Sequence, residues 1–436
     1  MDMVVTRIAP SPTGEMHIGT VRTALYNYLF AKQHGGTYFV RIEDTDKERN
    51  KHEWVDAIWR DFQWVGIVPD ARYVQSQNIE RHKELLKKLI DEGKAYISKE
   101  PKKDEPSKEI EVVRFKNPGI SITFEDLIRG LVTFDTTELG DFVIARSIDD
   151  PLYHFAVVVD DGDAGVTHVL RAEEHISNTP RQILLIEALG FQRPQYAHFP
   201  LILAPDRSKL SKRKHAASVE QYRAQGFIPE ALLNYLALVG WNPGGEQELF
   251  TLDELMKIFS LERMHKSGAV FDVEKLKWFN HEHLKRLSDD AFKERVENFA
   301  GVQVDEKLVP LLKERSQTLK DAADALQAGE YDFLGDSVSV NPALLLKGAK
   351  ADAAAVKTNL EGVSNLLHAI SDEHFTEAGV KEVVFPYATA QGRAAVLWPM
   401  RVALSGKEKS PDPFTLAGIL GKEKTLGRIA AAAKIL

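Results

Sequence analysis

The stretch V-V-T-R-I-A-P-S-P-T-G-E-M-H-I-G-T, Val4 to Thr20, decides the fold. It begins with an apolar run of strand length and leads into Gly19 to Lys32, where apolar residues recur at helical spacing. Gly14 and Gly19 let the backbone approach a phosphate closely, and His17 lies just before the amino end of the helix, where N–H groups favour anions. In isolation such a segment is more often a tight turn with an N-terminal histidine. Its neighbours along the chain must therefore decide its function.

Strand-like and helix-like segments alternate through the first 240 residues, as expected for a parallel α/β sheet. Thr179 caps a predicted helix with Pro180 at its first position and Gly190 after its end, and Pro229 and Gly240 bracket another in the same way. The predicted strands are Val4 to Ile8, Thr37 to Ile42, Phe155 to Val159 and Val166 to Leu170.

Two regions depart from this alternation. Residues 85 to 150 are predicted to form an inserted module, and the mixed-charge stretch Lys99 to Lys108 is interpreted as a loop because it lacks periodicity. After Trp241 the pattern becomes mostly helical, and the alanine-rich segment Ile429 to Leu436 is predicted to be a terminal helix.

Composition excludes several classes of protein. The 436 residues are 44% hydrophobic, enough for roughly three domains with their own cores. No apolar run reaches the ~18 residues of a membrane span, and the start of the chain leads straight into a strand rather than a signal peptide. The absence of cysteine excludes disulfides, thiolate zinc sites and a thiol nucleophile. We therefore expect a soluble, cytoplasmic protein without a membrane partner.

The formal charge of −8 argues against a nucleic-acid partner, because phosphate binding depends on lysine and arginine. The segment from Arg393 to Lys434 is an exception, with eight basic residues against Glu408, Asp412 and Glu423. This local excess of +5 is compatible with RNA binding, although a solvated helical tail is the commoner explanation of such a segment alone.

Charged residues follow the other predicted strands. Glu43 comes after the second strand, Arg171 and Glu174 come after the fourth, and Ser208 to Arg213 is a basic loop. Each is unremarkable alone: an acidic run is usually a solvated turn, an arginine at a strand end a surface ion pair, and a basic loop a solvated patch. In an open parallel sheet, ligands bind beyond the carboxyl ends of the strands. These strand-end residues are therefore expected at the same edge of the sheet as His17.

Taken together, these segments resemble class I aminoacyl-tRNA synthetases. His17 to Thr20 resembles their HIGH signature, and Lys209 to Arg213 resembles their KMSKS loop. The segments V-R-I-E-D-T-D, Y-H-F-A-V-V-V-D-D, V-L-R-A-E-E-H-I and P-E-A-L-L-N-Y-L-A-L-V-G-W are similar to the bacterial glutamyl branch. The resemblance covers nearly the whole chain and is weakest in the insertion and between about residues 290 and 390.

This resemblance implies a class I Rossmann-type parallel-sheet catalytic domain interrupted by an α+β module and followed by a mainly α-helical C-terminal half. It implies that the protein uses ATP to activate L-glutamate as glutamyl-adenylate and transfers it to the 3′ end of tRNA-Glu. Mg²⁺ is expected to arrive with ATP, without zinc or another resident metal, and the protein is expected to be a monomer. The implied division is 1–84 and 151–240 for the catalytic domain, 85–150 for the acceptor-binding module, 241–319 for stem contacts and 320–436 for anticodon binding.

The resemblance also assigns residues to the two substrates. His17, Lys209 and Lys212 are the implied catalytic residues, because charge develops on phosphate oxygens when a carboxylate attacks the α-phosphorus of ATP. The glutamate side-chain carboxylate is assigned to two arginines, its ammonium to Glu43, and the pocket wall to Tyr153. The implied glutamate-binding residues are Arg7, Ser11, Glu43, Tyr153 and Arg171, and the implied ATP-binding residues are Ala9, Ser11, His17, Gly19, Glu174, Ile202, Lys209 and Lys212.

Several positions depart from the family pattern. Thr20 replaces the second histidine of the HIGH signature, and Val157 replaces an asparagine that some relatives carry. Many bacterial relatives have a zinc-binding cysteine cluster in the insertion, whereas Tyr96 to Gly119 is short and cysteine-free. His281 and His283 are interpreted as part of a polar helix face rather than a metal site.

Individual residues and segments argue against three alternative functions. Arg171 argues against a glutaminyl enzyme, because a guanidinium gains more from a carboxylate than from an amide. The presence of His17 and Lys212 argues against a catalytically inactive tRNA-binding paralogue, and residues 320–436 argue against the short paralogue that glutamylates a modified tRNA base. Whether tRNA-Gln is charged as well stays open at this point.

Overall fold

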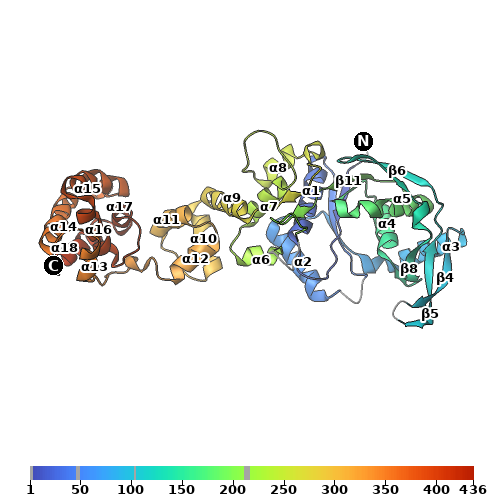
Figure 1. The fold of residues 1–436 in the computed structure, drawn as a ribbon, viewed down its shortest axis with the longest axis horizontal. Coiled ribbons are helices and arrows are strands. Elements are labelled where there is room, and N and C mark those ends of the chain that lie inside the picture. The colour runs from blue at the N-terminus through green and yellow to red at the C-terminus, as the bar shows by residue number, and fades with distance from the viewer. Residues whose placement is uncertain (1–2, 46–49, 103–104, 211–216) are drawn as a thin grey trace. The chain divides into compact units, whose positions relative to one another are not determined.

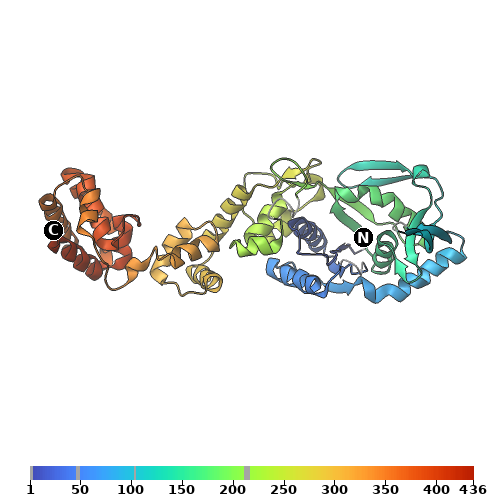
Figure 2. The same cartoon turned by 60° about the horizontal axis from the view of Figure 1, so that its bottom comes forward.

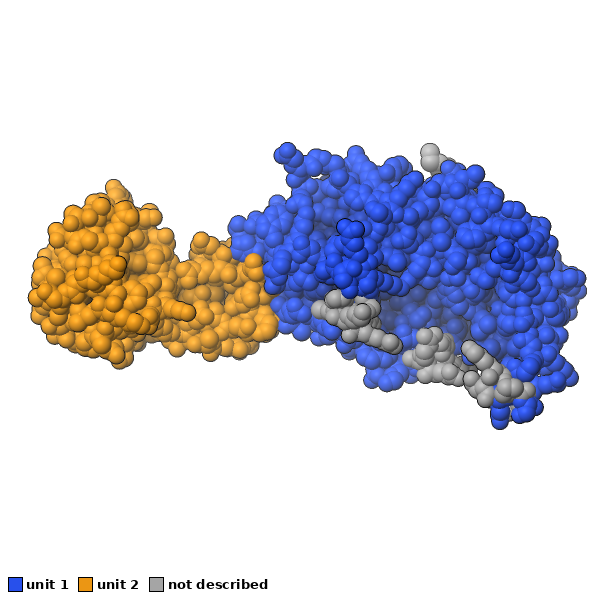
Figure 3. Space-filling model, in the orientation of Figure 1, with its two compact units in different colours: residues 1–286 blue, residues 287–436 orange. Residues whose placement is uncertain are grey.

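The computed structural model describes residues 3–45, 50–102, 105–210 and 217–436. They form two compact units, Met1–Arg286 and Leu287–Leu436, which Figure 3 shows in different colours. The first unit is an α/β structure, whereas the described residues of the second form helices and loops (Figures 1 and 2). The combination of a parallel-sheet domain and a mainly helical C-terminal half confirms the predicted fold class.

The first strands of the first unit form a parallel sheet that begins within the stretch Val4 to Thr20. Strand β1 (Val5–Ile8) pairs with β2 (Thr37–Ile42), which pairs with β3 (Ala71–Val74). On the other side of β1, the N–H of Thr167 donates to the carbonyl of Val5 at 3.1 Å, which brings in β10 (His168–Ala172) and its parallel neighbour β11 (Gln195–Phe199). Strand β10 begins two residues later than predicted and includes Arg171.

Helix α1 (Ile18–Gln33) packs across these strands, because its apolar face is buried against β1 and β10. The side chain of Asn27 is buried in the same interface and donates to the carbonyl of Leu170 at 3.0 Å. The same amide nitrogen donates to the carbonyl of Thr23 within α1 at 2.8 Å, so it links the helix backbone to the backbone of the sheet. The helix is thereby held with its amino end at the carboxyl edge of the strands.

The predicted strand Phe155 to Val159 is wrong, because these residues belong to helix α4 (Tyr153–Asp163). All five side chains are buried, so the segment is apolar on every side and has no periodicity that would separate a strand from a core helix. Its β-branched valines favour a strand locally, and packing against α5 (Thr179–Leu189) outweighs that preference. The change of element places Asp160 and Asp161 in the last turns of a helix.

The predicted loop Lys99 to Lys108 is also wrong, because most of it lies in an antiparallel pair, β4 (Ala95–Lys102) and β5 (Glu105–Phe115). Opposite charges across the strands, such as Glu100 and Arg114, stabilise a pair that lacks clear hydrophobic alternation. Residues 103 and 104 lie outside the described part of the chain.

The inserted module is divided between two sheets. One contains β4, β5, β8 (Phe142–Ser147) and β9 (Asp150–Pro151), and the other receives the hairpin of β6 (Ser121–Asp126) and β7 (Gly130–Asp135). This hairpin extends the parallel sheet, because β6 pairs in parallel with β11 through Asp126 and Tyr196. The other elements of the first unit are α2 (His52–Val65), α3 (Ile79–Asp91), β12 (Ile202–Leu203), α6 (Val219–Ala224), α7 (Pro229–Leu238), α8 (Leu252–Ile258), β13 (Ala269–Val270) and α9 (Val273–Arg286).

In the second unit, the basic C-terminal segment contributes to the packing of the helices. Arg428 is buried and donates to the carbonyls of Phe333 and Leu404, each at 2.6 Å, while Lys422 donates to the carbonyl of Ile370 at 2.6 Å. Part of the predicted surface charge therefore joins helices to loops. The helices are α10 (Asp289–Ala300), α11 (Val309–Arg315), α12 (Leu319–Gln327), α13 (Pro342–Lys347), α14 (Ala353–His368), α15 (Glu377–Gln391), α16 (Arg393–Ser405), α17 (Pro413–Leu420) and α18 (Lys422–Lys434).

Within the described residues, no helix combines the length and the apolar composition that crossing a membrane would require.

Candidate active site

A cavity of about 600 Å³ lies at the carboxyl edge of the parallel sheet. Its walls come from the end of β1, the loop before α1, the end of β2, the first turn of α4, the end of β10 and the segment around β12. Every predicted site residue that the structure describes lines this one cavity: Arg7, Ala9, Ser11, His17, Gly19, Glu43, Tyr153, Arg171, Glu174, Ile202 and Lys209. Lys212 lies outside the described residues.

His17 is the N-cap of α1, and its ring folds back over the start of the helix. Its Nδ1 accepts the backbone N–H of Gly19 at 2.9 Å, so the neutral ring carries its proton on Nε2. Residue 19 has to be small, because a Cβ there would lie 3.0 Å from Nδ1. The local sequence therefore fixes both the position of the imidazole and the nitrogen that can donate.

Arg7 is almost fully buried and is held by a carboxylate from α4. Its Nε lies 3.2 Å from Oδ1 and its Nη2 lies 3.0 Å from Oδ2 of Asp161, a bidentate pairing that fixes the plane of the guanidinium. Asp161 was not predicted as a site residue. It follows the apolar run that the sequence suggested was a strand, and the run gave no sign of the direction in which its side chain would point.

Glu43 is held by a second buried arginine, Arg41, which precedes it by two residues on β2 and therefore lies on the same face of the strand. Nη2 of Arg41 lies 3.1 Å from Glu43, and Nη1 lies 2.5 Å from Asp161. Asp161 thus bridges Arg7 and Arg41. The alternation of side chains along β2 is a sequence signal that could have identified Arg41.

Burial and charge act in opposite directions on these carboxyl groups. Burial favours protonation of Asp161, but Arg7 and Arg41 outweigh it and hold the pKa of Asp161 below its usual value. Burial raises the pKa of Glu43, and its partner Arg41 only partly offsets that effect. Glu43 is consequently a carboxylate that would gain from a further cation, whereas Asp161 already has two.

Arg171 enters the cavity from β10, and two of its three nitrogens are anchored. Its Nε donates to Nε2 of His198 at 3.1 Å, and its Nη2 donates to Oγ1 of Thr179 at 2.8 Å. Nη1 is buried and has no acceptor among the described residues. Burial lowers the pKa of Arg171 from its ordinary value, as expected for a cation without a carboxylate partner.

The part of the cavity that Ile202 lines also contains an exposed ion pair between Glu174 and Lys209, two residues that were predicted to contact ATP separately. Beside it, Glu173 accepts the N–H of Leu201 at 3.0 Å and pairs with Arg129 from the β6–β7 turn. The pair between Glu173 and Arg129, which the sequence did not indicate, holds the segment that carries Ile202.

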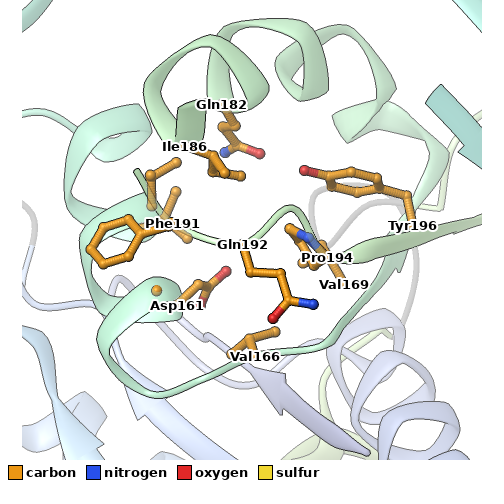
Figure 4. A pocket seen from close by; sticks show the side chains of 12 residues that line it. Asp161, Val166, Val169, Gln182, Ile186, Phe191, Gln192, Pro194 and Tyr196 are labelled. Carbon is orange, nitrogen blue, oxygen red and sulfur yellow. The ribbon is translucent and has the colours of Figure 1, made fainter. Parts of the chain in front are cut away.

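A second, smaller cavity of about 20 Å³ is lined by residues of α4 and α5 and shares Val157 with the large one. Figure 4 shows Gln182 and Tyr196 among the side chains around it, and both have buried polar atoms without a partner in the described part of the chain. Its volume suits one water molecule and no substrate.

The prediction that His281 and His283 form a polar helix face is wrong for His283. Its side chain is buried, and its Nε2 lies 2.8 Å from Oδ1 of Asn234 in α7. Among the residues that the structure describes, no group of three or more potential metal ligands comes together.

Comparison with known proteins agrees with this architecture. Residues 3–105 and 97–278 match the family described as tRNA synthetases class I (E and Q), catalytic domain, and residues 272–433 match the anticodon binding domain. The chain is 36% identical to the glutamate–tRNA ligase of Desulforamulus reducens, covering 98% of this chain and 99% of the relative. It is 38% identical to that of Thermodesulfovibrio yellowstonii, with 98% of each chain covered.

A solved structure is also similar over the full length. The crystal structure of a glutamate tRNA ligase from Elizabethkingia meningosepticum in complex with its amino acid superposes with a TM-score of 0.82 at 31% identity, covering 100% of each chain. Sequence, domain order and fold therefore agree, and the chain belongs to the family of class I glutamate–tRNA ligases.

Proposed function

We propose that Arg7 and Arg171 bind the side-chain carboxylate of L-glutamate and that Glu43 binds its α-ammonium group. The observation that carries this proposal is the convergence of these three buried, individually anchored charges on one cavity. A guanidinium recognises a carboxylate through paired, charge-assisted hydrogen bonds, and Nη1 of Arg171 still lacks an acceptor among the described residues. Ser11 and Tyr153 complete the amino-acid side of the cavity.

ATP occupies the other side in this proposal. The α-carboxylate of glutamate attacks the α-phosphorus of ATP, so a carboxylate–phosphorus bond forms as the bond to pyrophosphate breaks. His17 donates from Nε2 to the α-phosphate, and Lys209 and Lys212 neutralise charge on the departing pyrophosphate. Mg²⁺ enters as part of the ATP substrate. Lys212 is assigned from the sequence alone.

The adenosine and ribose lie against Ala9, Gly19, Glu174 and Ile202. Glu174 pairs with Lys209, so ATP exchanges this exposed ion pair for contacts to the ribose hydroxyls and the phosphates. An exposed pair of this kind is worth at most about 1 kcal/mol and is a small barrier to nucleotide binding.

The glutamyl group is then transferred to the 3′ end of tRNA-Glu. We assign acceptor-end contacts to residues 85–150, stem contacts to 241–319 and anticodon contacts to 320–436, in a monomeric, cytoplasmic enzyme. An enzyme that also charges tRNA-Gln would use the same amino-acid pocket, because it too activates glutamate.

ATP–pyrophosphate exchange with glutamate or glutamine, with and without tRNA, tests the pocket. Glutamate should be preferred by several kcal/mol, because an amide leaves the buried guanidinium donors poorly matched. Arg171→Ala should reduce that preference and raise the KM for glutamate. Equal exchange with the two amino acids in the wild-type enzyme would refute the assignment. Aminoacylation of purified tRNA-Glu and tRNA-Gln in parallel decides whether one or both are charged.

A further inference from the structure

We propose that Asp126, which the inserted hairpin brings to the catalytic sheet, is a positioning residue that orients Arg171 through His198. The proposal rests on the proposed role of Arg171 in glutamate recognition. It assigns the β6–β7 hairpin a second task, in addition to extending the sheet.

The carboxylate of Asp126 is held in one orientation by hydrogen bonds. Asp126 is the last residue of β6, and its Oδ1 accepts the backbone N–H groups of Ile128 at 3.0 Å and Arg129 at 2.8 Å. Its Oδ2 lies 2.6 Å from Nδ1 of His198 and 3.1 Å from the backbone nitrogen of the same residue. Both side chains are fully buried. The turn of the hairpin therefore determines which oxygen faces the imidazole.

The imidazole of His198 is held in a single tautomer. Arg171 and His198 are direct neighbours on the paired strands β10 and β11, and Nε of Arg171 donates to Nε2 of His198 at 3.1 Å. A guanidinium nitrogen can only donate, so Nε2 has to accept, and the ring proton has to lie on Nδ1, where Asp126 accepts it. The ionised carboxylate thus selects the tautomer that can hold Arg171.

The electrostatics agree with this order of donors and acceptors. Burial lowers the pKa of His198 despite the hydrogen bond to Asp126, which keeps the ring neutral near pH 7. Burial favours protonation of Asp126, but the hydrogen bonds from His198 and from the backbone N–H groups of Arg129 and Ile128 together outweigh it and lower the pKa of Asp126. A neutral acceptor ring and an ionised carboxylate are the two states that the arrangement requires.

The consequence for the pocket is that one edge of the guanidinium is fixed. With Nε held by His198 and Nη2 held by Thr179, the only nitrogen of Arg171 without an acceptor among the described residues is Nη1. Loss of the Nε acceptor would leave a buried donor unpaired and allow the guanidinium to turn toward another acceptor. Its donors would then no longer be arranged for a carboxylate.

The central test is Asp126→Asn. The amide oxygen should stay with the two backbone N–H groups, which turns the NH₂ group toward Nδ1 and forces the proton to Nε2. Two donors, Nε2–H and Nε–H of Arg171, would then face each other. We expect the KM for glutamate in ATP–pyrophosphate exchange to rise about tenfold or more, the glutamate-over-glutamine preference to fall, and kcat to change much less. The imidazole ¹⁵N spectrum of His198 should report the exchanged tautomer.

A matched control is available on the same hairpin. Asp135→Asn makes the same chemical change at an exposed carboxylate that only caps the turn at Thr137. Its KM for glutamate should equal that of the wild type. An effect of Asp126→Asn that merely reflected a loosened hairpin would appear as a lower melting temperature with the tautomer unchanged.

His198 provides an independent route if Asp126→Asn does not fold. His198→Leu removes the hydrogen-bond acceptor for Arg171 and leaves an apolar side chain. In His198→Gln, the side-chain carbonyl can accept from Arg171, and this acceptor does not depend on a choice of tautomer. We expect the leucine variant to lose glutamate affinity and the glutamine variant to retain most of it. In the His198→Gln background, Asp126→Asn should cost little further, and fully additive losses would overturn the proposal.

Arg171→Ala tests the role of Arg171 in glutamate binding separately from the positioning role of Asp126 and His198. If Arg171→Ala leaves the KM for glutamate and the preference over glutamine unchanged, the proposed role of Arg171 fails. If Arg171→Ala loses both while Asp126→Asn and His198→Leu keep wild-type values, only the positioning role of Asp126 and His198 is refuted.

Discussion

At the scale of single residues, Glu43 connects burial to pH dependence. Burial raises its pKa more than Arg41 lowers it, so Glu43 takes up a proton at a higher pH than an ordinary carboxyl. The protonated form cannot attract the α-ammonium group of glutamate. Glutamate binding should therefore be strongest above this raised pKa and weaken as the pH falls through it.

The prediction is that the KM for glutamate increases on acidification before the pH reaches ~4.3, where a free γ-carboxyl protonates. Glu43→Gln should bind glutamate more weakly at neutral pH and should lose this pH dependence. Exchange kinetics from about pH 5 to pH 8 would check both. Identical pH profiles for the wild type and Glu43→Gln would show that another group is responsible.

Asp161 is the residue whose loss should cost the most stability. It bridges two buried arginines, and removing one partner of a buried ion pair leaves an uncompensated charge. Asp161→Asn should reduce the free energy of unfolding by about 3 kcal/mol and weaken glutamate binding through Arg7. Urea denaturation followed by circular dichroism measures the first effect.

Asp163→Asn is the matched control, because Asp163 lies on the same helix and pairs with Arg81 at the surface. Its loss should cost less than about 1 kcal/mol. Comparable destabilisation by the two variants would mean that the buried network contributes no more than a surface pair.

At the scale of elements, the packing of α4 against the segment that directly follows α5 depends on a glycine. A Cβ at Gly162 would lie 2.6 Å from the ring of Phe191, one of the side chains around the small cavity in Figure 4. Gly162→Ala should destabilise the first unit by roughly 1–3 kcal/mol, because steric overlap exceeds the gain in helix propensity.

Gly427→Ala in α18 should have the opposite sign. A Cβ there meets no atom within 4 Å, so only the helix propensity changes, a gain of up to about 1 kcal/mol. Thermal unfolding of both variants measures the contrast. Stabilisation by Gly162→Ala would show that α4 and the segment that follows α5 can separate without cost.

At the scale of the whole molecule, the cavity and the match to an anticodon binding domain belong to different units. The cavity is built entirely from residues of the unit Met1–Arg286, and the match to an anticodon binding domain covers the other unit. The unit boundary lies upstream of residue 320, where the anticodon region was predicted to begin, and α10 packs against α12. A cut at Arg286 therefore avoids dividing packed helices.

We predict that a chain ending at Arg286, if it folds, binds a glutamyl-adenylate analogue like the full chain but binds tRNA-Glu much more weakly. The salt dependence of tRNA binding should also be shallower, because fewer phosphate contacts release fewer counterions. Filter binding across a salt series, with tRNAs that differ only in the anticodon, measures affinity and discrimination. Circular dichroism and gel filtration check folding, and unchanged affinity and discrimination in a folded chain would move recognition to the first unit.

The sequence by itself determined the class of the fold and the edge at which the site lies. Alternating apolar segments indicated a parallel sheet, and His17, Glu43 and Arg171 lie at or beyond the carboxyl ends of strands that meet at one edge. These residues could be predicted because their positions depend on local pattern and on a rule that holds for open parallel sheets in general.

Only the tertiary structure decided which groups hold those residues. Asp161 pairs with Arg7 across 154 positions in the chain, and Asp126 reaches His198 across 72. The valines of α4 are buried on every side, and a short apolar run of this kind does not reveal whether it forms a helix or a strand. Pairing between distant charges depends on the packing of several elements at once, and local sequence preferences carry no information about that packing.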